Sequence, residues 1–294
     1  MNPTAANSIE NIILGHSQRG MDRLRPYLVA DFCAAAARSL WALPRGNVLL
    51  TTGFYVAGHA ETDGPVGTVL LGQALQKIGF NPIIISDHYG RDIFAAEGDW
   101  EVVYVPMAPE NEAAYFNSIL DRYHPVGLLA IERCGRTDQG DYLNMRGISI
   151  RNNTAPIDQL FIMARARHLL TIGIGDGGNE IGMGNLQAEI RQQLDLNPCT
   201  VEADHLIIAT VSNWGAYGLL AALQAFTSVS LLPPAQAVEN YLVKIVQRGC
   251  VDGVTQAGTY SVDGYDVEVE KEVLEQLSRA VQHRGVAAGL MRSN

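Results

Sequence analysis

The chain has 294 residues, of which 47% are hydrophobic, and its formal net charge is -10 at neutral pH. This length allows a sizeable core in one large domain or in two tightly packed ones. The acidic balance argues against a nucleic-acid-binding protein, which presents a basic face to phosphates. No apolar stretch approaches the ~18 residues of a membrane span, and residues 1–20 do not resemble a signal peptide. Four widely spaced cysteines are typical of free thiols, so we expect a cytoplasmic protein.

Apolar runs and helical patterns alternate along the chain. Runs typical of strands buried on both faces lie at residues 47–54, 82–85, 100–105, 126–131, 168–174 and 205–210. Helical patterns lie at residues 30–43, 66–78, 111–123, 157–167, 181–194, 214–227, 234–248 and 266–283, while residues 86–99 have mixed polarity and predict no element. The alternation predicts an α/β fold, a three-layer αβα arrangement with a mostly parallel central sheet. We expect a single α/β catalytic domain over residues 1–294, with a helical segment at residues 1–46 packed on it.

Ligands of parallel sheets bind beyond the carboxyl ends of the strands, so the loops that follow the strands are the candidates for chemistry. The first such loop carries His59, Glu61 and Asp63. Asp63 is a candidate for substrate binding, and the alternative is that it caps the helix that follows. In that alternative Glu61 is a solvated acid, and we expect His59 to be incidental.

The second loop begins with Glu132, which directly follows a buried strand, and contains Arg133, Arg136 and Arg146. A guanidinium presents a rigid fork that pairs a carboxylate through two hydrogen bonds. The alternative is an ion-paired surface loop. Three arginines interleaved with acids and glycines in an acidic chain favour a site for a small carboxylate.

The third loop is rich in glycine. The nucleotide-binding spacing Gly-x-Gly-x-x-Gly is formally met by Gly173, Gly175 and Gly178. However, Asp176 lies inside the turn that would hold a pyrophosphate and would repel it, and the lysine of a P-loop is absent. The sequence therefore argues against a nucleotide cradle.

Acidic side chains in this loop favour another chemistry. Asp176 and Glu180, four residues apart, would share one face if the turn entered a helix. Together with Asn179 they could hold a hard divalent cation, or they could serve as acid and base. The alternative is a tight turn in which these side chains satisfy backbone groups. Gly177 and Gly178 could offer their amides to an anion.

The fourth loop, at residues 209–218, opens a helix. Ser212 or Asn213 could cap that helix. Asn213 or the free amides could equally hold a substrate carboxylate.

Four motifs, one from each loop, carry a resemblance to a known family. They are Glu61-Thr62-Asp63-Gly64-Pro65, Glu132-Arg133-x-Gly135 through Asn144-Met145-Arg146-Gly147, Ile172-Gly173 through Gly184-Asn185, and Val211-Ser212-Asn213-Trp214-Gly215-Ala216-Tyr217. Together they resemble the D-glutamate cyclase family, from about Val48 to Gly264. In animals this domain resembles the carboxyl-terminal half of a longer mitochondrial protein. The resemblance implies a hydro-lyase that reversibly converts D-glutamate into 5-oxo-D-proline and water.

This reaction assigns roles to the loops. The α-amine attacks the γ-carboxyl carbon, so a base is needed, and the catalytic candidates are Glu132, Asp176 and Glu180. Hydroxide leaves poorly, so an acid or a metal must assist. No organic cofactor is expected, and the metal candidates are Asp176 and Glu180. The candidates for substrate binding are Asp63, Arg133, Arg136, Asn144, Arg146, Gly177, Gly178, Asn179 and Asn213.

Two other classes of function remain open. One is a non-catalytic module that binds a small carboxylic acid, and the other is a metal-dependent hydrolase of another lactam or of a phosphorylated compound. The paired acids of the glycine loop favour the enzyme, because a pure carboxylate binder would avoid them. The expected partner is a small amino-acid or carboxylic-acid substrate, with no nucleic acid and no membrane, and assembly into a homo-oligomer is left open.

Overall fold

The computed structural model describes residues 8–17, 19–94, 100–227 and 229–291. Its centre is a six-stranded sheet in the order β5-β4-β1-β6-β7-β8, in which every neighbouring pair is parallel. The strands are β1 (Asn47–Thr51), β4 (Asn81–Ser86), β5 (Glu101–Tyr104), β6 (Gly127–Ile131), β7 (Leu170–Gly175) and β8 (His205–Ile208). The predicted α/β fold is thus confirmed, and the sheet is entirely parallel.

The strand order places a topological switch point in the middle of the sheet. From β1 the chain moves outward through β4 to β5, then crosses back to β6 on the other side of β1. Loops that leave β1 and β6 therefore diverge and open a crevice, which is where ligands of such sheets bind. Strand β6 is buried along its whole length, as its unbroken apolar run predicts.

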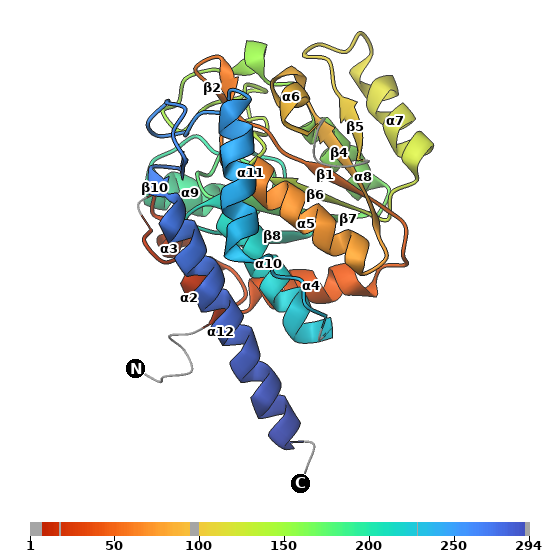
Figure 1. Cartoon of the computed structure of the whole chain (residues 1–294). Coiled ribbons are helices and arrows are strands. Elements are labelled where there is room, and N and C mark those ends of the chain that lie inside the picture. The colour runs from red at the N-terminus through yellow and green to blue at the C-terminus, as the bar shows by residue number, and fades with distance from the viewer. Residues whose placement is uncertain (1–7, 18, 95–99, 228, 292–294) are drawn as a thin grey trace.

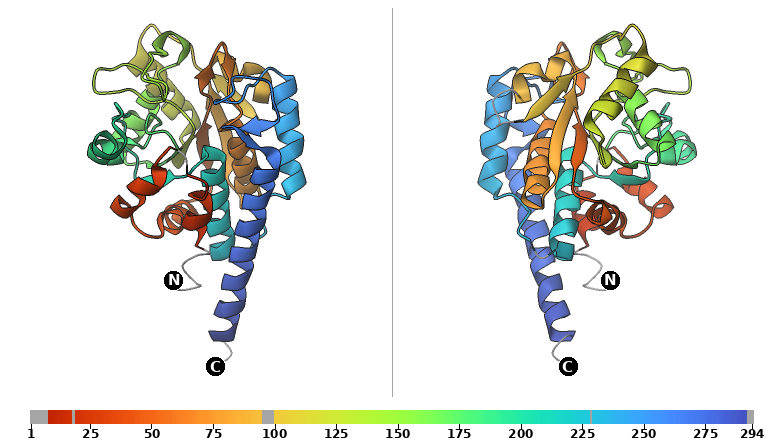
Figure 2. Two further views of the ribbon diagram at one scale, coloured as in Figure 1. Left: turned by 90° about the vertical axis from the view of Figure 1, so that its left-hand side faces the viewer. Right: turned by 90° about the vertical axis from the view of Figure 1, so that its right-hand side faces the viewer.

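Helices cover both faces of the sheet (Figures 1 and 2). They are α2 (Ile9–Ile13), α3 (Met21–Leu24), α4 (Phe32–Ala42), α5 (Pro65–Lys77), α6 (Arg91–Phe94), α7 (Glu112–Tyr123), α8 (Asp158–Ala166), α9 (Gln187–Leu194), α10 (Ser212–Thr227), α11 (Ala235–Gln247) and α12 (Val267–Met291). Helices α5 and α10 lie on one face, and α7 and α8 lie on the other. Among the helices of the described segments, none combines the length and the apolar character needed to cross a membrane.

Helix α10 is the central helix of its layer. It packs against α4, α5 and α12 as well as the sheet, and residues 212–223 are buried on every side. A helix that is apolar all round needs such an environment. Helices α2 and α4 also contact α10, so the segment before β1 is packed onto the same layer. The far end of α12 projects beyond the rest of the molecule (Figure 1).

Two predicted features differ in the structure. The helix expected at residues 181–194 begins only at Gln187, because Gly182 and Met183 form bridges with Glu202 instead. Asp176 and Glu180 therefore lie in a loop, so the helix in which they would share one face does not form there. Residues 86–99 contain a short 3-10 turn (His88–Gly90) and α6, and residues 95–99 lie outside the described part of the chain.

Candidate active site

Buried acidic side chains gather beyond the carboxyl ends of β1, β6 and β7. We call this set the acidic cluster, and its members are Glu61, Asp63, Glu132, Asp176, Glu180 and Asp263. Asp263 comes from the hairpin of β9 (Ser261–Val262) and β10 (Tyr265–Asp266). Arg19, between α2 and α3, reaches into the cluster and pairs Asp176 at 2.6 Å and Asp263 at 2.8 Å. Segments from both ends of the chain thus complete a site built on the central strands.

Asp63 and Asn213 cap each other's helices. Both oxygens of Asp63 accept backbone N–H groups at the start of α10, from Ser212 and Asn213, each at 2.8 Å. The side-chain oxygen of Asn213 accepts the N–H groups of Gly64 and Gly67 at the start of α5. The prediction that Asp63 caps its own following helix is therefore wrong, because the cap of α5 comes from 150 residues later in the chain. Asn213 is fully buried and is occupied by this role.

Glu132 is held in an unusual conformation at the end of β6. Its φ of 47° lies in the left-handed region, and its own N–H donates to the carbonyl of Ile174. Its carboxyl oxygen accepts a hydrogen bond of 2.6 Å from the hydroxyl of Ser212. Burial raises the pKa of Glu132 well above its usual value, and the neighbouring Asp176 and Glu180 raise it further. The protonated form of Glu132 is therefore favoured relative to that of an exposed glutamate.

The glycine loop holds one of its own acids. The two oxygens of Glu180 accept the N–H groups of Gly177 at 2.7 Å and Gly178 at 2.8 Å. These amides, predicted to hold a substrate anion, are thus filled by the chain's own carboxylate. Burial raises the pKa of Glu180, while the amide donors act in the opposite direction. The side chain of Asn179 donates to the carbonyl of Leu143.

Two overlapping groups of carboxylates could hold a metal ion. One group is Asp63, Asp176 and Asp263, and the other is Glu132, Asp176 and Glu180. Within each group the ligand oxygens lie within 4.8 Å of one another, and Asp176 belongs to both. Burial raises the pKa of Asp176 to about 7, against the opposing effect of Arg19, and burial raises that of Asp63 to about 8. These raised pKa values favour the uptake of positive charge by the cluster, either as protons or as a cation.

The three arginines of the second loop have different environments. Arg133 is only 1% exposed, pairs Asp87 at 2.6 Å and donates to the carbonyls of Gly53 and Ala155. Its two terminal nitrogens are occupied by protein groups and join three loops, while its buried Nε has no partner. This geometry favours a structural role over contact with a substrate.

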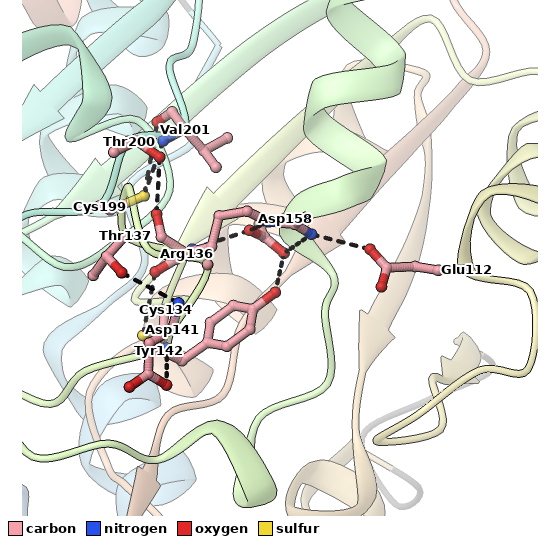
Figure 3. Close-up of polar contacts among 12 residues, drawn as sticks. Glu112, Cys134, Arg136, Thr137, Asp141, Tyr142, Asp158, Cys199, Thr200 and Val201 are labelled. Carbon is pink, nitrogen blue, oxygen red and sulfur yellow. Dashed lines mark hydrogen bonds and ion pairs between the residues drawn. The ribbon is translucent and has the colours of Figure 1, made fainter.

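Arg136 also lies away from the cluster. It pairs Asp158 at 2.6 Å and Glu112 at 3.0 Å, and Asp158 also accepts the hydroxyl of Tyr142 (Figure 3). This network lines a different cavity, together with Arg151. Of the three predicted arginines, Arg146 is the one that lines a cavity together with Glu132 and Glu180.

A cavity of about 600 Å³, which counts its open mouth, gives access to the cluster. Glu61, Glu132 and Glu180 line it, whereas Asp176 lies behind its wall. The other lining residues include Arg19, Phe54, Tyr55, Asn144, Met145, Arg146, Gly177, Asn179, Gly253 and Gln256. Of the predicted residues, Glu132, Asn144, Arg146, Gly177, Asn179 and Glu180 thus share one cavity.

Three members of the site escaped the sequence reasoning. Glu61 was expected to be solvated, yet it is 6% exposed and lines the cavity. Arg19 and Asp263 lie 157 and 87 residues from Asp176, outside the strand-end loops. The Asp263-Gly264 pair, with Gly264 at a φ of 79°, was the available signal for a structured turn.

Comparison with known proteins supports the family resemblance that the four loop motifs of the sequence carry. The family model described as "D-glutamate cyclase-like, C-terminal" matches residues 9–278. Human mitochondrial D-glutamate cyclase is 35% identical over 207 residues, which cover 63% of this chain and 34% of that protein, so the chain spans about a third of the relative's length. A solved structure of UDP-glucose 4-epimerase from Brucella ovis with NAD is 14% identical over 51% of this chain and 49% of that chain, with a TM-score of 0.30, too low to support an inference. The family match, which extends over most of the chain, shows that the chain belongs to the D-glutamate cyclase-like family.

Proposed function

We propose that the chain is a hydro-lyase that interconverts D-glutamate and 5-oxo-D-proline plus water. The observation that carries the proposal is the meeting of Glu132 and Glu180 on one cavity, with oxygens within 4.8 Å of a shared neighbour, Asp176. Cyclisation needs one group that accepts a proton and another that donates one, and two carboxyl groups in unequal environments provide this pair. The human relative's name supports the choice of substrate.

Glu180 acts as the base in this proposal. Its two amide donors favour the charged form and oppose the effect of burial, which raises its pKa, so Glu180 is assigned the carboxylate that takes a proton from the substrate's α-ammonium group. The neutral amine then attacks the γ-carboxyl carbon, and a C–N bond forms. Because the flexible substrate must fold into a near-ring shape, confinement in the cavity contributes a large proximity effect.

Glu132 acts as the acid. Its raised pKa favours the protonated form, so it can give its proton to the departing γ-carboxyl oxygen. That oxygen leaves as water after it takes a second proton, the one that Glu180 removed from the ammonium group. The nitrogen loses its other surplus proton to Glu132, so both carboxyl groups return to their starting forms. Both carboxyl groups are buried, but the amides of Gly177 and Gly178 oppose the rise in the pKa of Glu180, whereas neighbouring acids raise the pKa of Glu132 further. In the reverse direction Glu132 takes a proton from the attacking water and Glu180 returns one to the ring nitrogen.

Arg146 at the mouth of the cavity binds the substrate's α-carboxylate in this proposal, and Arg19 lies on the same cavity wall. Arg133 and Arg136 stabilise the loop that presents Glu132. Asn144 shapes the turn that carries Arg146, because its side chain accepts the N–H groups of Arg146 and Ile148. No electron transfer is involved, so the proposal includes no organic cofactor.

Proton NMR of the purified chain with D- and L-glutamate and with both 5-oxoprolines tests this function. We expect D-glutamate and 5-oxo-D-proline to interconvert until they reach the same ratio from either side. Tight binding without turnover would instead support a module that binds a small acid. Turnover of other lactams, with none of 5-oxo-D-proline, would support the hydrolase alternative.

A further inference from the structure

The acidic cluster holds more negative charge than its surroundings neutralise. Its six carboxyl groups against the single positive charge of Arg19 leave an excess of five negative charges when all are ionised. Isolated buried charges are strongly unfavourable, so such a site gains free energy when it takes up protons or a cation. The proposed reaction uses Glu132 and Glu180, which leaves the deeper acids Asp176 and Asp263 without a chemical role.

Unpartnered oxygens point to a ligand among these deeper acids. Oδ2 of Asp176 and Oδ2 of Asp263 are buried and have no hydrogen-bond donor, while each residue's Oδ1 accepts Arg19. Oε1 of Glu61 is also buried and unpartnered. Most buried carboxylate oxygens accept at least one donor, so these unpartnered oxygens need an explanation.

We propose that Asp63, Asp176 and Asp263 bind one hard divalent metal ion. When no metal ion is bound, the guanidinium of Arg19 occupies the position of that ion. The three ligands are all carboxylates with oxygens within 4.8 Å of one another, and oxygen-only sets select Mg²⁺ or Mn²⁺ over softer metals. Asp63 is already fixed by three backbone N–H groups, so it enters the site preorganised and keeps a lone pair for the ion.

A second cavity offers space for the side chain of Arg19 when a cation displaces it. This side chain forms part of the wall between the catalytic cavity and that second, adjoining cavity, which Arg23, Met145 and Gln193 also line. The side chain is 19% exposed, unlike the carboxylates it pairs. Rotation of this side chain would move the guanidinium from Asp176 and Asp263 into the second cavity, where it can meet the carboxylate of an arriving substrate, a consequence that rests on the proposed function.

Titration of the full-length chain with Mn²⁺, followed by the EPR signal of the free ion, tests this exchange without any turnover. We expect one Mn²⁺ per chain, displaced by excess Mg²⁺. Arg19→Met removes the internal competitor and keeps most of the side-chain volume, so it should bind Mn²⁺ about tenfold more tightly. Asp263→Asn should lose binding. Asp31→Asn, which changes an exposed acid paired with Arg38, should bind like the parent.

Three results would overturn the proposal. These are no Mn²⁺ bound by either the parent or Arg19→Met, equal affinity in these two proteins, or unchanged binding in Asp263→Asn. Circular dichroism melting of each variant shows whether it is folded, and Arg19→Lys provides a second folded variant with intermediate expected affinity, because its charge remains but its fork is lost. Since binding is measured without substrate, failure of this site and failure of the proposed reaction give separate results.

Discussion

Burial of Glu270 should make the free energy of unfolding of this protein depend on pH. This residue lies on α12, is fully buried, and accepts hydrogen bonds from the indole of Trp214 at 2.5 Å and the hydroxyl of Tyr217 at 3.0 Å, both on α10. Burial raises its pKa to about 7, although the two donors favour the charged form. Helix α10 begins at Ser212, which donates hydrogen bonds to Asp63 and Glu132. The contact of Glu270 with α10 therefore helps to hold the candidate active site in place.

Replacement of Glu270 by glutamine removes the ionisable group and keeps an acceptor for Trp214. A carboxyl whose pKa is raised on folding contributes stability that is complete below its unfolded pKa and is lost as pH rises through the folded pKa. From an unfolded value of 4.5 to a folded value of about 7, the loss amounts to about 3 kcal/mol. We therefore expect the parent to lose about 3 kcal/mol relative to Glu270→Gln between pH 4.5 and pH 8.

Urea unfolding of both proteins at several pH values between 4.5 and 8 measures this difference. The other buried acids are common to both proteins and cancel in the comparison. Glu268→Gln is a matched control, because Glu268 lies on the same helix but is 69% exposed, and its difference from the parent should not follow this pH dependence. A Glu270→Gln difference that stays constant across the range would refute the reasoning.

Further variants test the assigned roles. Glu132→Gln and Glu180→Gln should each lower turnover of D-glutamate about 10²–10⁴-fold while the protein stays folded, as judged by NMR rates and circular dichroism; near-parent rates in either would remove that residue from the reaction. Ser212→Ala withdraws a donor that favours the charged form of Glu132, so the alkaline limb of the pH–rate profile should move to higher pH, whereas Ser212→Thr should restore it. Asn213→Ala leaves the N–H groups at the start of α5 unpaired and should cost about 2 kcal/mol in urea unfolding, against about 1 kcal/mol for Asn111→Ala at the exposed cap of α7; equal costs would contradict the capping argument.

The strands and most helices could be predicted because their signals are local. The apolar run that forms β6 and the helical pattern that forms α7 each report on neighbours a few residues away. The parallel sheet follows from their alternation, and so does the expectation that loops at strand ends meet. Glu132 and Glu180 were therefore found as candidates from the sequence.

Side-chain partners were predicted less well, because partners distant in sequence decide them. Asp63 and Asn213 are both residue types that commonly cap the helix that follows them in the chain. In the structure each caps the other's helix instead, because α5 packs beside α10. The guanidinium of Arg133 has the chemistry to bind a substrate carboxylate, but it forms an ion pair with the buried carboxylate of Asp87. Arg19 gives no local signal at all, because its significance comes from two acids on distant segments.

Incorporation of ¹⁸O from labelled water tests the central claim most directly. With 5-oxo-D-proline as substrate, the ring-opening direction adds one water oxygen to the γ-carboxyl carbon, so mass spectrometry should find D-glutamate with one ¹⁸O from a single turnover. The label should appear with the parent chain and be nearly absent with Glu132→Gln and Glu180→Gln. Absence of labelled glutamate with the parent, or equal labelling rates in all three proteins, would contradict the proposed chemistry at this cavity.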